Sequence, residues 1–396
     1  MKKLLHLSLG LACVSACAET EESIGTLVHE DGPRHSWTSS IVDSTRAQAL
    51  LGRDPGGRLA LVRLDDGEVV TRFSLGALDG VPDASAFVRD DGSLSHLALL
   101  AHDAEEQGGR LRFASASPEG FARPVSVAAL NGVTRTLALE GGALVMQDDL
   151  GERWSFAQKD GVFATTTACP KPASILAHDS SPSHAAVLAF AWSAEAEPVL
   201  VDATLTNAEW RCDVFPLTGA GSLSPSARAA LVPELGAVIV DGDPSGLRVA
   251  LAGGSEVGPF VSSDLRALRV EQVEPFRLEG RSGVVVLTSR PAAVTALTLE
   301  RGVGGELTIA ESVSVLLPFV VESPWFSREL ALTHDRLFIA TDGGLVGFAL
   351  MLAPTLDLEQ IALPESLAEL RGPLVPVPIL PVGYLPAVDH DHSRSD

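Results

Sequence analysis

The sequence predicts an all-β fold, a single β-propeller of seven blades, with six or eight blades as the alternatives. From about residue 40 to 370, short apolar runs alternate with turns rich in glycine, aspartate and proline, which is typical of strands rather than long helices. Hairpins recur about every 40 to 50 residues, the period of a propeller blade. Sandwich domains would need about 100 residues each and visible linkers between them, and no such linker stands out.

The clearest hairpins pair two apolar runs across a short turn. An Asp-Asp-Gly turn divides residues 58–75, and a Gly-Gly turn divides residues 134–149. Such turns are strong hairpin signals. Similar hairpins lie at 236–254, 283–300 and 336–352. The first strands of the seven evident hairpins begin near Leu59, His96, Thr134, Ala185, Ala237, Val284 and Arg336.

The N-terminus has the pattern of an export signal. Lys2 and Lys3 precede an apolar run from Leu4 to Val14, and small residues follow. These are the parts of a secretory signal peptide. The run is about a dozen residues long, and a membrane-spanning helix requires about 20. We therefore expect residues 1–16 to be a signal peptide that is removed, and not a permanent transmembrane anchor.

Val14-Ser15-Ala16-Cys17 resembles the lipobox of bacterial lipoproteins. The resemblance implies that the Cys17 thiol receives a diacylglyceryl group and that Cys17 becomes the first mature residue, with a further acyl chain on its amine. Two or three such chains anchor a protein almost permanently. Ala18 stands where an aspartate often retains lipoproteins at the inner membrane, so the resemblance implies the outer membrane in a bacterium that has two. The alternative is an ordinary signal cleaved after Ala16 or Ala18, which would release a soluble protein.

The rest of the chain divides into three parts. Residues 17–37 are polar and acidic and predict a flexible tether, and residues 38–372 form the predicted propeller. Residues 373–396 are rich in proline. Proline cannot donate the hydrogen bond that a central strand needs, so we expect these residues to form a C-terminal tail. A propeller usually closes by pairing strands from both ends of the chain, but no motif marks where this closure occurs.

Composition and charge restrict the classes of partner. Hydrophobic residues make up 46% and charged residues 20% of the chain, with 36 glycines and 25 prolines, which fits a globular body with many turns. The formal net charge is −22. An acidic surface repels nucleic acid and anionic lipid headgroups, so we expect no nucleic-acid partner, and membrane contact only through the lipid anchor. Solubility explains the acidity more simply than a patch for a basic partner.

The cysteines predict one disulfide bond. Cys13 leaves with the signal and Cys17 is assigned to the lipid, which leaves Cys169 and Cys212. Two cysteines in an oxidising compartment tend to pair. A loop of this length would stabilise the fold by about 4 kcal/mol in the chain-entropy model. The alternative is two buried free thiols, and no histidine lies at zinc-ligand spacing from either cysteine.

One hairpin resembles known propeller repeats. ALVRLDDGEVVTRFSLG, residues 60–76, is similar to repeats of the YVTN-type and quinoprotein-like propellers, where Asp or Asn and a Gly turn precede a strand with alternating valines. The resemblance implies the propeller fold. The tryptophan that ends quinoprotein repeats is missing, so it implies no bound cofactor, and we expect none.

The best candidate for an ion site is the stretch DGDPSG. Asp241, Asp243 and Ser245 stand at positions one, three and five, with a glycine at six, like the opening of a calcium loop. Apolar residues occupy positions nine and twelve, where a carboxylate would be needed. A polar hairpin turn explains the stretch equally well, so Ca²⁺ stays a minor hypothesis.

Histidine–aspartate pairs are the best candidates for catalysis. In the channel of a ring they could bind a metal or relay protons. They do not share one phase of the blade period, however, and an aspartate at a strand end commonly forms a turn. We therefore favour strand-end capping. The pairs are His102-Asp103, His178-Asp179 and His334-Asp335, with His390-Asp391-His392 near the C-terminus.

Other motifs do not indicate an enzyme. The sequence has no Gly-x-Ser-x-Gly elbow, phosphate loop, HExxH pair or dinucleotide fingerprint. The tryptophans are scattered, and they predict core packing rather than a sugar-stacking platform. They are Trp37, Trp154, Trp192, Trp210 and Trp325.

These observations predict an exported, lipid-anchored β-propeller that acts as a monomeric binding or scaffolding module and meets a protein partner on one rim. Loops on a rim can vary without disturbing strand pairing, which suits recognition. Two alternatives stay open. One is a metal-dependent or His/Asp hydrolase or lyase at the channel, and the other is a glycan-binding surface lipoprotein.

Overall fold

The computed structural model describes most of the chain from residue 47 to residue 378. The described residues are 47–73, 83–89, 94–103, 108–117, 120–121, 125–131, 133–147, 153–158, 161–167, 169–181, 184–206, 209–219, 221, 223–253, 256–318, 329–341 and 343–378. The predicted signal peptide, Cys17 and the predicted tether lie outside them, as does the chain after residue 378.

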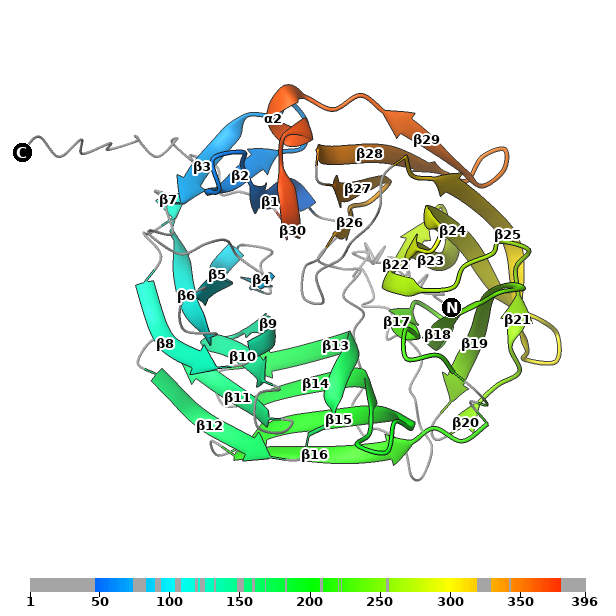
Figure 1. Cartoon of the computed structure of the whole chain (residues 1–396), viewed down its shortest axis with the longest axis horizontal. Coiled ribbons are helices and arrows are strands. Elements are labelled where there is room, and N and C mark those ends of the chain that lie inside the picture. The colour runs from blue at the N-terminus through cyan, green and yellow to red at the C-terminus, as the bar shows by residue number, and fades with distance from the viewer. Residues whose placement is uncertain are drawn as a thin grey trace, which may run out of the picture.

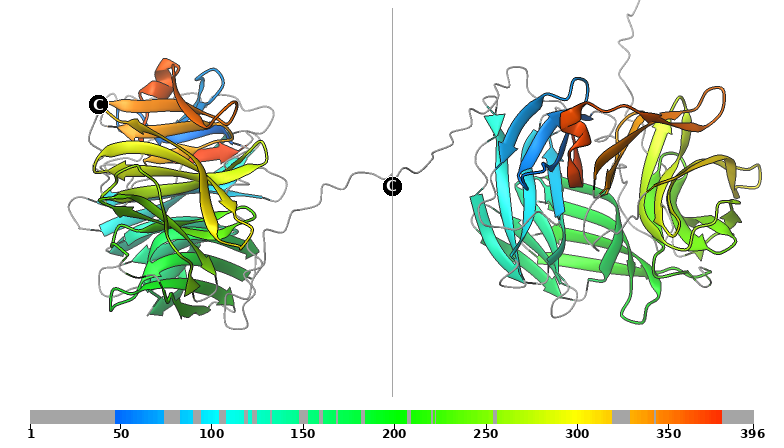
Figure 2. Two further views of the ribbon diagram at one scale, coloured as in Figure 1. Left: turned by 90° about the vertical axis from the view of Figure 1, so that its right-hand side faces the viewer. Right: turned by 45° about the horizontal axis from the view of Figure 1, so that its top comes forward.

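Seven antiparallel sheets surround a central axis, so the chain is a seven-bladed β-propeller (Figure 1). The predicted fold class and the preferred blade number are confirmed. The side views show that the sheets follow one another around the axis as a single ring (Figure 2).

Each blade is a small sheet whose strands follow one another from the axis outward. Blade 1 contains β30 (Arg371–Pro378), β1 (Ala47–Arg53), β2 (Leu59–Arg63) and β3 (Val69–Phe73). Blade 2 contains β4 (Asp83–Val88), β5 (Leu94–Asp103) and β6 (Gly108–Ser117), with β7 (Gly120–Phe121) and β8 (Val125–Asn131) on β6. Blade 3 contains β9 (Val133–Leu139), β10 (Gly142–Gln147), β11 (Arg153–Gln158) and β12 (Gly161–Thr167).

The remaining blades follow the same order. Blade 4 contains β13 (Lys171–Ser181), β14 (His184–Trp192), β15 (Pro198–Thr206) and β16 (Glu209–Pro216). Blade 5 contains β17 (Arg228–Val232), β18 (Gly236–Asp243) and β19 (Gly246–Gly253), with β20 (Glu256–Val257) and β21 (Val261–Ser262) on β19. Blade 6 contains β22 (Val270–Leu278), β23 (Arg281–Ser289), β24 (Ala292–Arg301) and β25 (Leu307–Leu316). Blade 7 contains β26 (Leu330–Leu332), β27 (Arg336–Thr341), β28 (Gly344–Met351) and β29 (Asp357–Ile361).

The hydrophobic core lies between the blades. Seven clusters of buried apolar side chains fill the interfaces between neighbouring blades. Successive side chains of a strand point to opposite faces, so each blade supplies two clusters. On β23, Val284 and Val286 pack toward blade 5, while Val285 and Leu287 pack toward blade 7. This burial on both faces explains why the strands have continuous apolar runs.

The ring closes between the two ends of the described chain. β30 pairs antiparallel with β1, with Val375 opposite Leu51 and Pro376 opposite Leu50. The expectation that residues after 372 are too rich in proline for a strand of the propeller is therefore wrong for residues 373–378. β30 is central to the molecule but is the edge strand of its own sheet, and proline is tolerated on edge strands because one side needs no ladder hydrogen bond.

The only helix among the described residues is α2 (Glu365–Ala368), which leads into β30. Within the described chain, no helix is long and apolar enough to cross a membrane.

Candidate functional site

The innermost strands of all seven blades line one cavity on the axis of the ring. Its volume is about 670 Å³, and its lining comes from β4, β9, β13, β17, β22, β26 and β30. Each of these strands contacts the next around the circle. The cavity is therefore a product of ring closure and exists only when all seven blades are in place.

Several polar side chains of this lining join neighbouring blades. Asp83 on β4 accepts hydrogen bonds from the N–H (2.6 Å) and the hydroxyl (3.3 Å) of Thr136 on β9. The Ser174 hydroxyl on β13 accepts a 3.0 Å hydrogen bond from a backbone N–H of β17. The Gln272 amide on β22 donates to the carbonyl and accepts from the N–H of Leu330 on β26. These groups hold the innermost strands together, so they are less available to a ligand.

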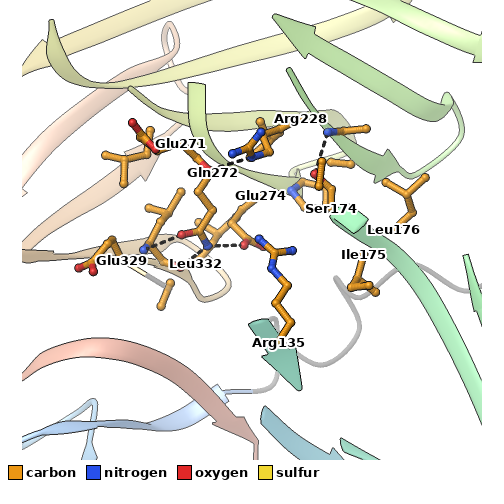
Figure 3. A pocket seen from close by; sticks show the side chains of 18 of the residues that line it. Arg135, Ser174, Ile175, Leu176, Arg228, Glu271, Gln272, Glu274, Glu329 and Leu332 are labelled. Carbon is orange, nitrogen blue, oxygen red and sulfur yellow. Dashed lines mark hydrogen bonds between the residues drawn. The ribbon is translucent and has the colours of Figure 1, made fainter. Parts of the chain in front are cut away.

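Arg228 is a strongly desolvated cation of the lining. Its Nε donates to the backbone carbonyl of Glu271 (3.2 Å), and Nη1 donates to that of Ala227 (3.0 Å). Burial lowers the pKa of Arg228 to about 10, and the nearby positive charge of Arg135 contributes to this lowering. Figure 3 shows Arg135 and Arg228 reaching into the same part of the cavity from different blades.

The carboxylate of Glu271 is neutralised from its own blade. Arg269 Nε lies 2.8 Å from Glu271 Oε1, and the Ser289 hydroxyl donates to the same oxygen at 2.5 Å. The Glu271 side chain is 7% exposed. This carboxylate therefore already has a cation and a hydroxyl, while Arg228 contacts only the backbone of the same residue.

Charges of both signs balance around the cavity. Among the described residues, the positively charged lining consists of Arg135, Arg228, Arg269 and Arg290, and the negatively charged lining consists of Asp83, Glu271, Glu274 and Glu329. The whole chain has a formal net charge of −22. The axis is thus much less negative than the protein as a whole, which favours an anion there over an anion on the outer surface.

Asp241, one of the predicted calcium ligands, forms hydrogen bonds and an ion pair with residues of blade 5 and the segment before it. It is fully buried and lies on β18. Its Oδ1 accepts a 2.5 Å hydrogen bond from the Ser224 hydroxyl, its Oδ2 accepts one from the Ser224 N–H (3.2 Å), and Arg248 forms an ion pair with Oδ2. The Arg248 guanidinium also lies over the Phe260 ring, 5.0 Å from its centroid.

Asp243 and Ser245 form the turn that follows. The Ser245 N–H (2.8 Å) and hydroxyl (2.5 Å) both donate to Asp243 Oδ1. These hydrogen bonds, together with the charge of Arg248 at 3.8 Å, lower the pKa of the partly exposed Asp243 carboxyl. Among the described residues, no group of three or more His, Cys, Asp or Glu side chains is placed to hold a metal ion. The calcium hypothesis stays a prediction, with Arg248 as a competitor for Asp241.

The histidine–aspartate pairs occupy different parts of the ring. His178 lines the cavity from β13, and its neighbour Asp179 is exposed. His334 and Asp335 lie exposed in the turn between β26 and β27. His102 and Asp103 end β5 in blade 2, and residues 390–392 lie outside the described residues.

Three of the tryptophans lie in or against the hydrophobic clusters between blades. Trp154 of blade 3 and Trp210 of blade 4 are buried, with ring centroids 6.3 Å apart. Trp192 is partly buried against Phe190. Core packing is confirmed for these residues, whereas Trp37 and Trp325 lie outside the described residues.

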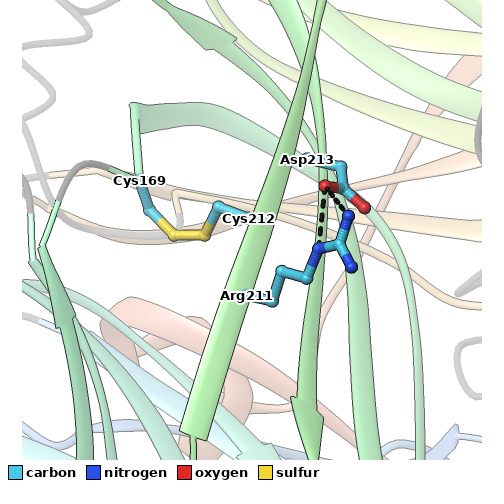
Figure 4. The surroundings of a disulfide bond; sticks show 4 residues. All are labelled: Cys169, Arg211, Cys212 and Asp213. Atoms are coloured by element: carbon cyan, nitrogen blue, oxygen red, sulfur yellow. Dashed lines mark hydrogen bonds and ion pairs between the residues drawn. A yellow bond between two sulfur atoms is a disulfide. The ribbon is translucent and has the colours of Figure 1, made fainter.

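The predicted disulfide bond is present. Cys169 lies between β12 and β13, and it pairs with Cys212 on β16, the outermost strand of blade 4 (Figure 4). The two Cα atoms are 5.7 Å apart, and the loop spans 43 residues. The bond fixes the segment that connects blade 3 with blade 4 to the outer edge of blade 4. Both cysteines contact the hydrophobic cluster between these two blades.

Replacing both cysteines by alanine should lower the free energy of unfolding by about 2 to 4 kcal/mol, because the unfolded chain regains the freedom of the closed loop. Urea denaturation of the oxidised protein measures the effect. Dithiothreitol should destabilise the wild type by a similar amount and leave the double variant unchanged. A wild type that is insensitive to the reductant would contradict the prediction.

The comparisons with known proteins concern the fold. No protein-family model matches the sequence, and no curated protein matches it. Among solved structures, a functionally unknown protein from Desulfotomaculum acetoxidans is similar, with a TM-score of 0.52 and 14% identity over 83% of this chain and 99% of that one. Hsv2 from Kluyveromyces lactis has a TM-score of 0.50 and 8% identity, covering 81% of this chain and 97% of its own.

A lower similarity involves BamB from Moraxella catarrhalis, with a TM-score of 0.40, 10% identity and coverage of 76% of this chain and 91% of that one. At these identities a likeness shows the fold alone. The shared fold is the propeller. Function has to be argued from the residues of this chain.

The sequence did not reveal the cavity or Arg228. A single arginine before the apolar run 229–232 has no distinguishing motif. The order of strands within a blade could have indicated its position. If the hairpin at 236–254 supplies the second and third strands of a blade, the apolar run 229–232 before it is the innermost strand. Arg228 would then lie next to the axis.

Proposed function

We propose that this chain is an exported, lipid-anchored β-propeller that serves as a binding or scaffolding module. The observation that carries the proposal is that polar side chains around the axis form hydrogen bonds between neighbouring blades. Asp83, Ser174 and Gln272, which could assist catalysis, instead join one blade to the next. A ring built in this way is a rigid support for variable loops, and such loops suit recognition of a protein partner on one rim.

The disulfide bond supports the extracytoplasmic part of the proposal. Structural disulfides form and persist in the periplasm or outside the cell and are rare in the cytosol. The Cys169–Cys212 bond ties an outer strand of the ring. Together with the signal-like N-terminus and the lipobox-like residues before Cys17, it favours a folded body displayed from a membrane by its lipid, at the outer membrane of a two-membrane bacterium.

Replacing Cys17 by serine should move the protein from the membrane fraction to the soluble fraction or leave its signal uncleaved, because the acyl chains supply the membrane affinity. The measurement is fractionation of a two-membrane bacterial host after a high-salt wash, with mass spectrometry of the N-terminal peptide. Cys13→Ser is the matched control, since this residue leaves with the signal. A Cys17→Ser protein that is processed and still membrane-bound, or an unmodified wild-type N-terminus, would contradict the lipid anchor.

A further inference from the structure

We propose that the axial cavity binds a small amphipathic organic acid, whose single carboxylate contacts Arg228 and whose apolar body lies against the inner strands. This inference goes beyond the proposed function, because it concerns a small molecule on the axis and not a protein partner on a rim. It does not depend on the lipid anchor.

Arg228 has donors to spare. A guanidinium carries five N–H donors, and the two hydrogen bonds of Arg228 go to backbone carbonyls, those of Glu271 and Ala227. Within the described residues, none of its hydrogen bonds goes to a carboxylate. A ligand carboxylate would supply the missing negative charge and two acceptors in the parallel geometry that a guanidinium prefers.

The acidic side chains of the cavity have other contacts. Glu271 is held by Arg269 and Ser289, and Asp83 by Thr136. Glu274 Oε1 accepts a 2.7 Å hydrogen bond from the Gln272 amide. The charge of Glu271 still raises the pKa of Arg228, but burial outweighs this effect, and among the described residues no carboxylate accepts a hydrogen bond from Arg228.

The charge balance favours a monoanion. Among the described residues, four arginines and four carboxylates line the cavity, so one extra negative charge beside Arg228 is tolerated. A doubly charged phosphate ester would also have to approach Glu271 and Glu274, and the chain as a whole is strongly acidic. Like charges at close range are costly where water is partly excluded.

Parts of the cavity wall suit an apolar body. Ile175 on β13 (Figure 3) is partly exposed and Leu268 is 53% exposed, and both line the same cavity, whereas Leu176 and Leu332 are almost fully buried in the clusters between blades. The volume of about 670 Å³ lies within the usual range for small-molecule sites, which combine apolar walls with a few fixed polar groups. An acid with a short alkyl or aryl group matches both features.

Isothermal titration calorimetry of the full chain in detergent tests the site with butanoate, hexanoate and benzoate as probes. Each acid should bind the wild type at least tenfold more tightly than its primary amide, because the amide lacks the charge. Arg228→Gln should weaken acid binding at least tenfold, and Arg228→Lys should weaken it less. Arg211→Gln, on an exposed arginine of β16, should have no effect. All variants share the detergent, so partition of a probe into micelles cancels.

Circular dichroism checks that the variants fold, and the comparison of acid with amide in the wild type decides the question even if Arg228→Gln does not. Equal affinity for acids and amides would overturn the proposal, as would no binding of any acid up to about 10 mM. Unchanged acid affinity in a folded Arg228→Gln variant would overturn it too. Tighter binding of hexyl phosphate than of hexanoate would overturn the assignment to a monocarboxylate.

Discussion

A chain that ends at residue 370 should fail to form a closed ring, whereas a chain that ends at residue 378 should fold like the wild type. The difference between the two is β30, the innermost strand of blade 1. Val375 and Val377 belong to the cluster between blades 1 and 2, and Leu374 belongs to the cluster between blades 7 and 1. Loss of this strand therefore opens two interfaces at once.

The expected size of the effect follows from burial. Leu374, Val375 and Val377 are at most 2% exposed, and burying each such side chain contributes about 1.5–3 kcal/mol. Their sum is comparable with the whole stability of many domains, which is about 5–15 kcal/mol. β1 would also lose its ladder partner and leave unpaired backbone groups at the axis.

Thermal melting followed by circular dichroism, together with gel filtration, distinguishes the two truncations. The 1–378 chain should melt cooperatively at the wild-type temperature and elute as a compact monomer. The 1–370 chain should melt without a cooperative transition or should aggregate. If the shorter chain melted at the wild-type temperature, closure by β30 would not be essential to the ring.

The hairpins could be predicted because their turns are determined locally. Gly67 and Gly141 adopt positive φ angles of 75° and 76° in the structure, a conformation that glycine adopts without a steric penalty. The hairpins β2–β3 and β9–β10 lie where the apolar runs and these turns predicted them. The cysteine count likewise predicted the disulfide, because elimination left a single pair.

The blade period was harder to measure. The hairpin start predicted at Leu59 lies on β2, the third strand of its blade. The start predicted at Thr134 lies on β9, an innermost strand. The other markers fall on second strands, as His96 does on β5. The sequence distance between two predicted starts therefore varies even where the blades are alike, because the starts lie at different positions within their blades. Strands with both faces buried have no apolar–polar alternation, so the sequence does not indicate a strand's position in its blade.

Ring closure and the cavity could not be predicted for a related reason. The pairing of β1 with β30 joins opposite ends of the described chain, and no local turn specifies it. Proline in residues 373–378 argued against a strand, since the rule for central strands was applied to a strand that is an edge of its sheet. The cavity depends on this closure, so Arg228 could not be placed beside Arg135 from sequence.

Asp241→Ala should destabilise the protein by about 3–5 kcal/mol, the usual cost of removing one partner of a buried ion pair. Asp241 is fully buried, and the Arg248 side chain that pairs with it is 21% exposed. The substitution also removes the acceptor for the Ser224 N–H and hydroxyl. Urea denaturation measures the loss, and the matched control is Asp243→Ala. The Asp243 carboxylate is 31% exposed, organises a turn with Ser245 and lies 3.8 Å from Arg248 Nε, so its contacts are weaker than those of the fully buried Asp241. The control should unfold near the urea midpoint of the wild type.

The same pair of variants separates the structural interpretation of Asp241 from the calcium hypothesis. A calcium ion held by both aspartates would make the two substitutions similarly harmful, would raise the melting temperature of the wild type when Ca²⁺ is added, and would lower it with a chelator. A buried ion pair predicts a large loss for Asp241→Ala alone and no response to either reagent. It also predicts that Asp241→Asn is milder than Asp241→Ala, because the amide oxygen still accepts a hydrogen bond from Ser224 although it no longer balances the charge of Arg248. Equal losses at Asp241 and Asp243, together with a calcium-dependent melting temperature, would overturn the structural interpretation and restore the ion site.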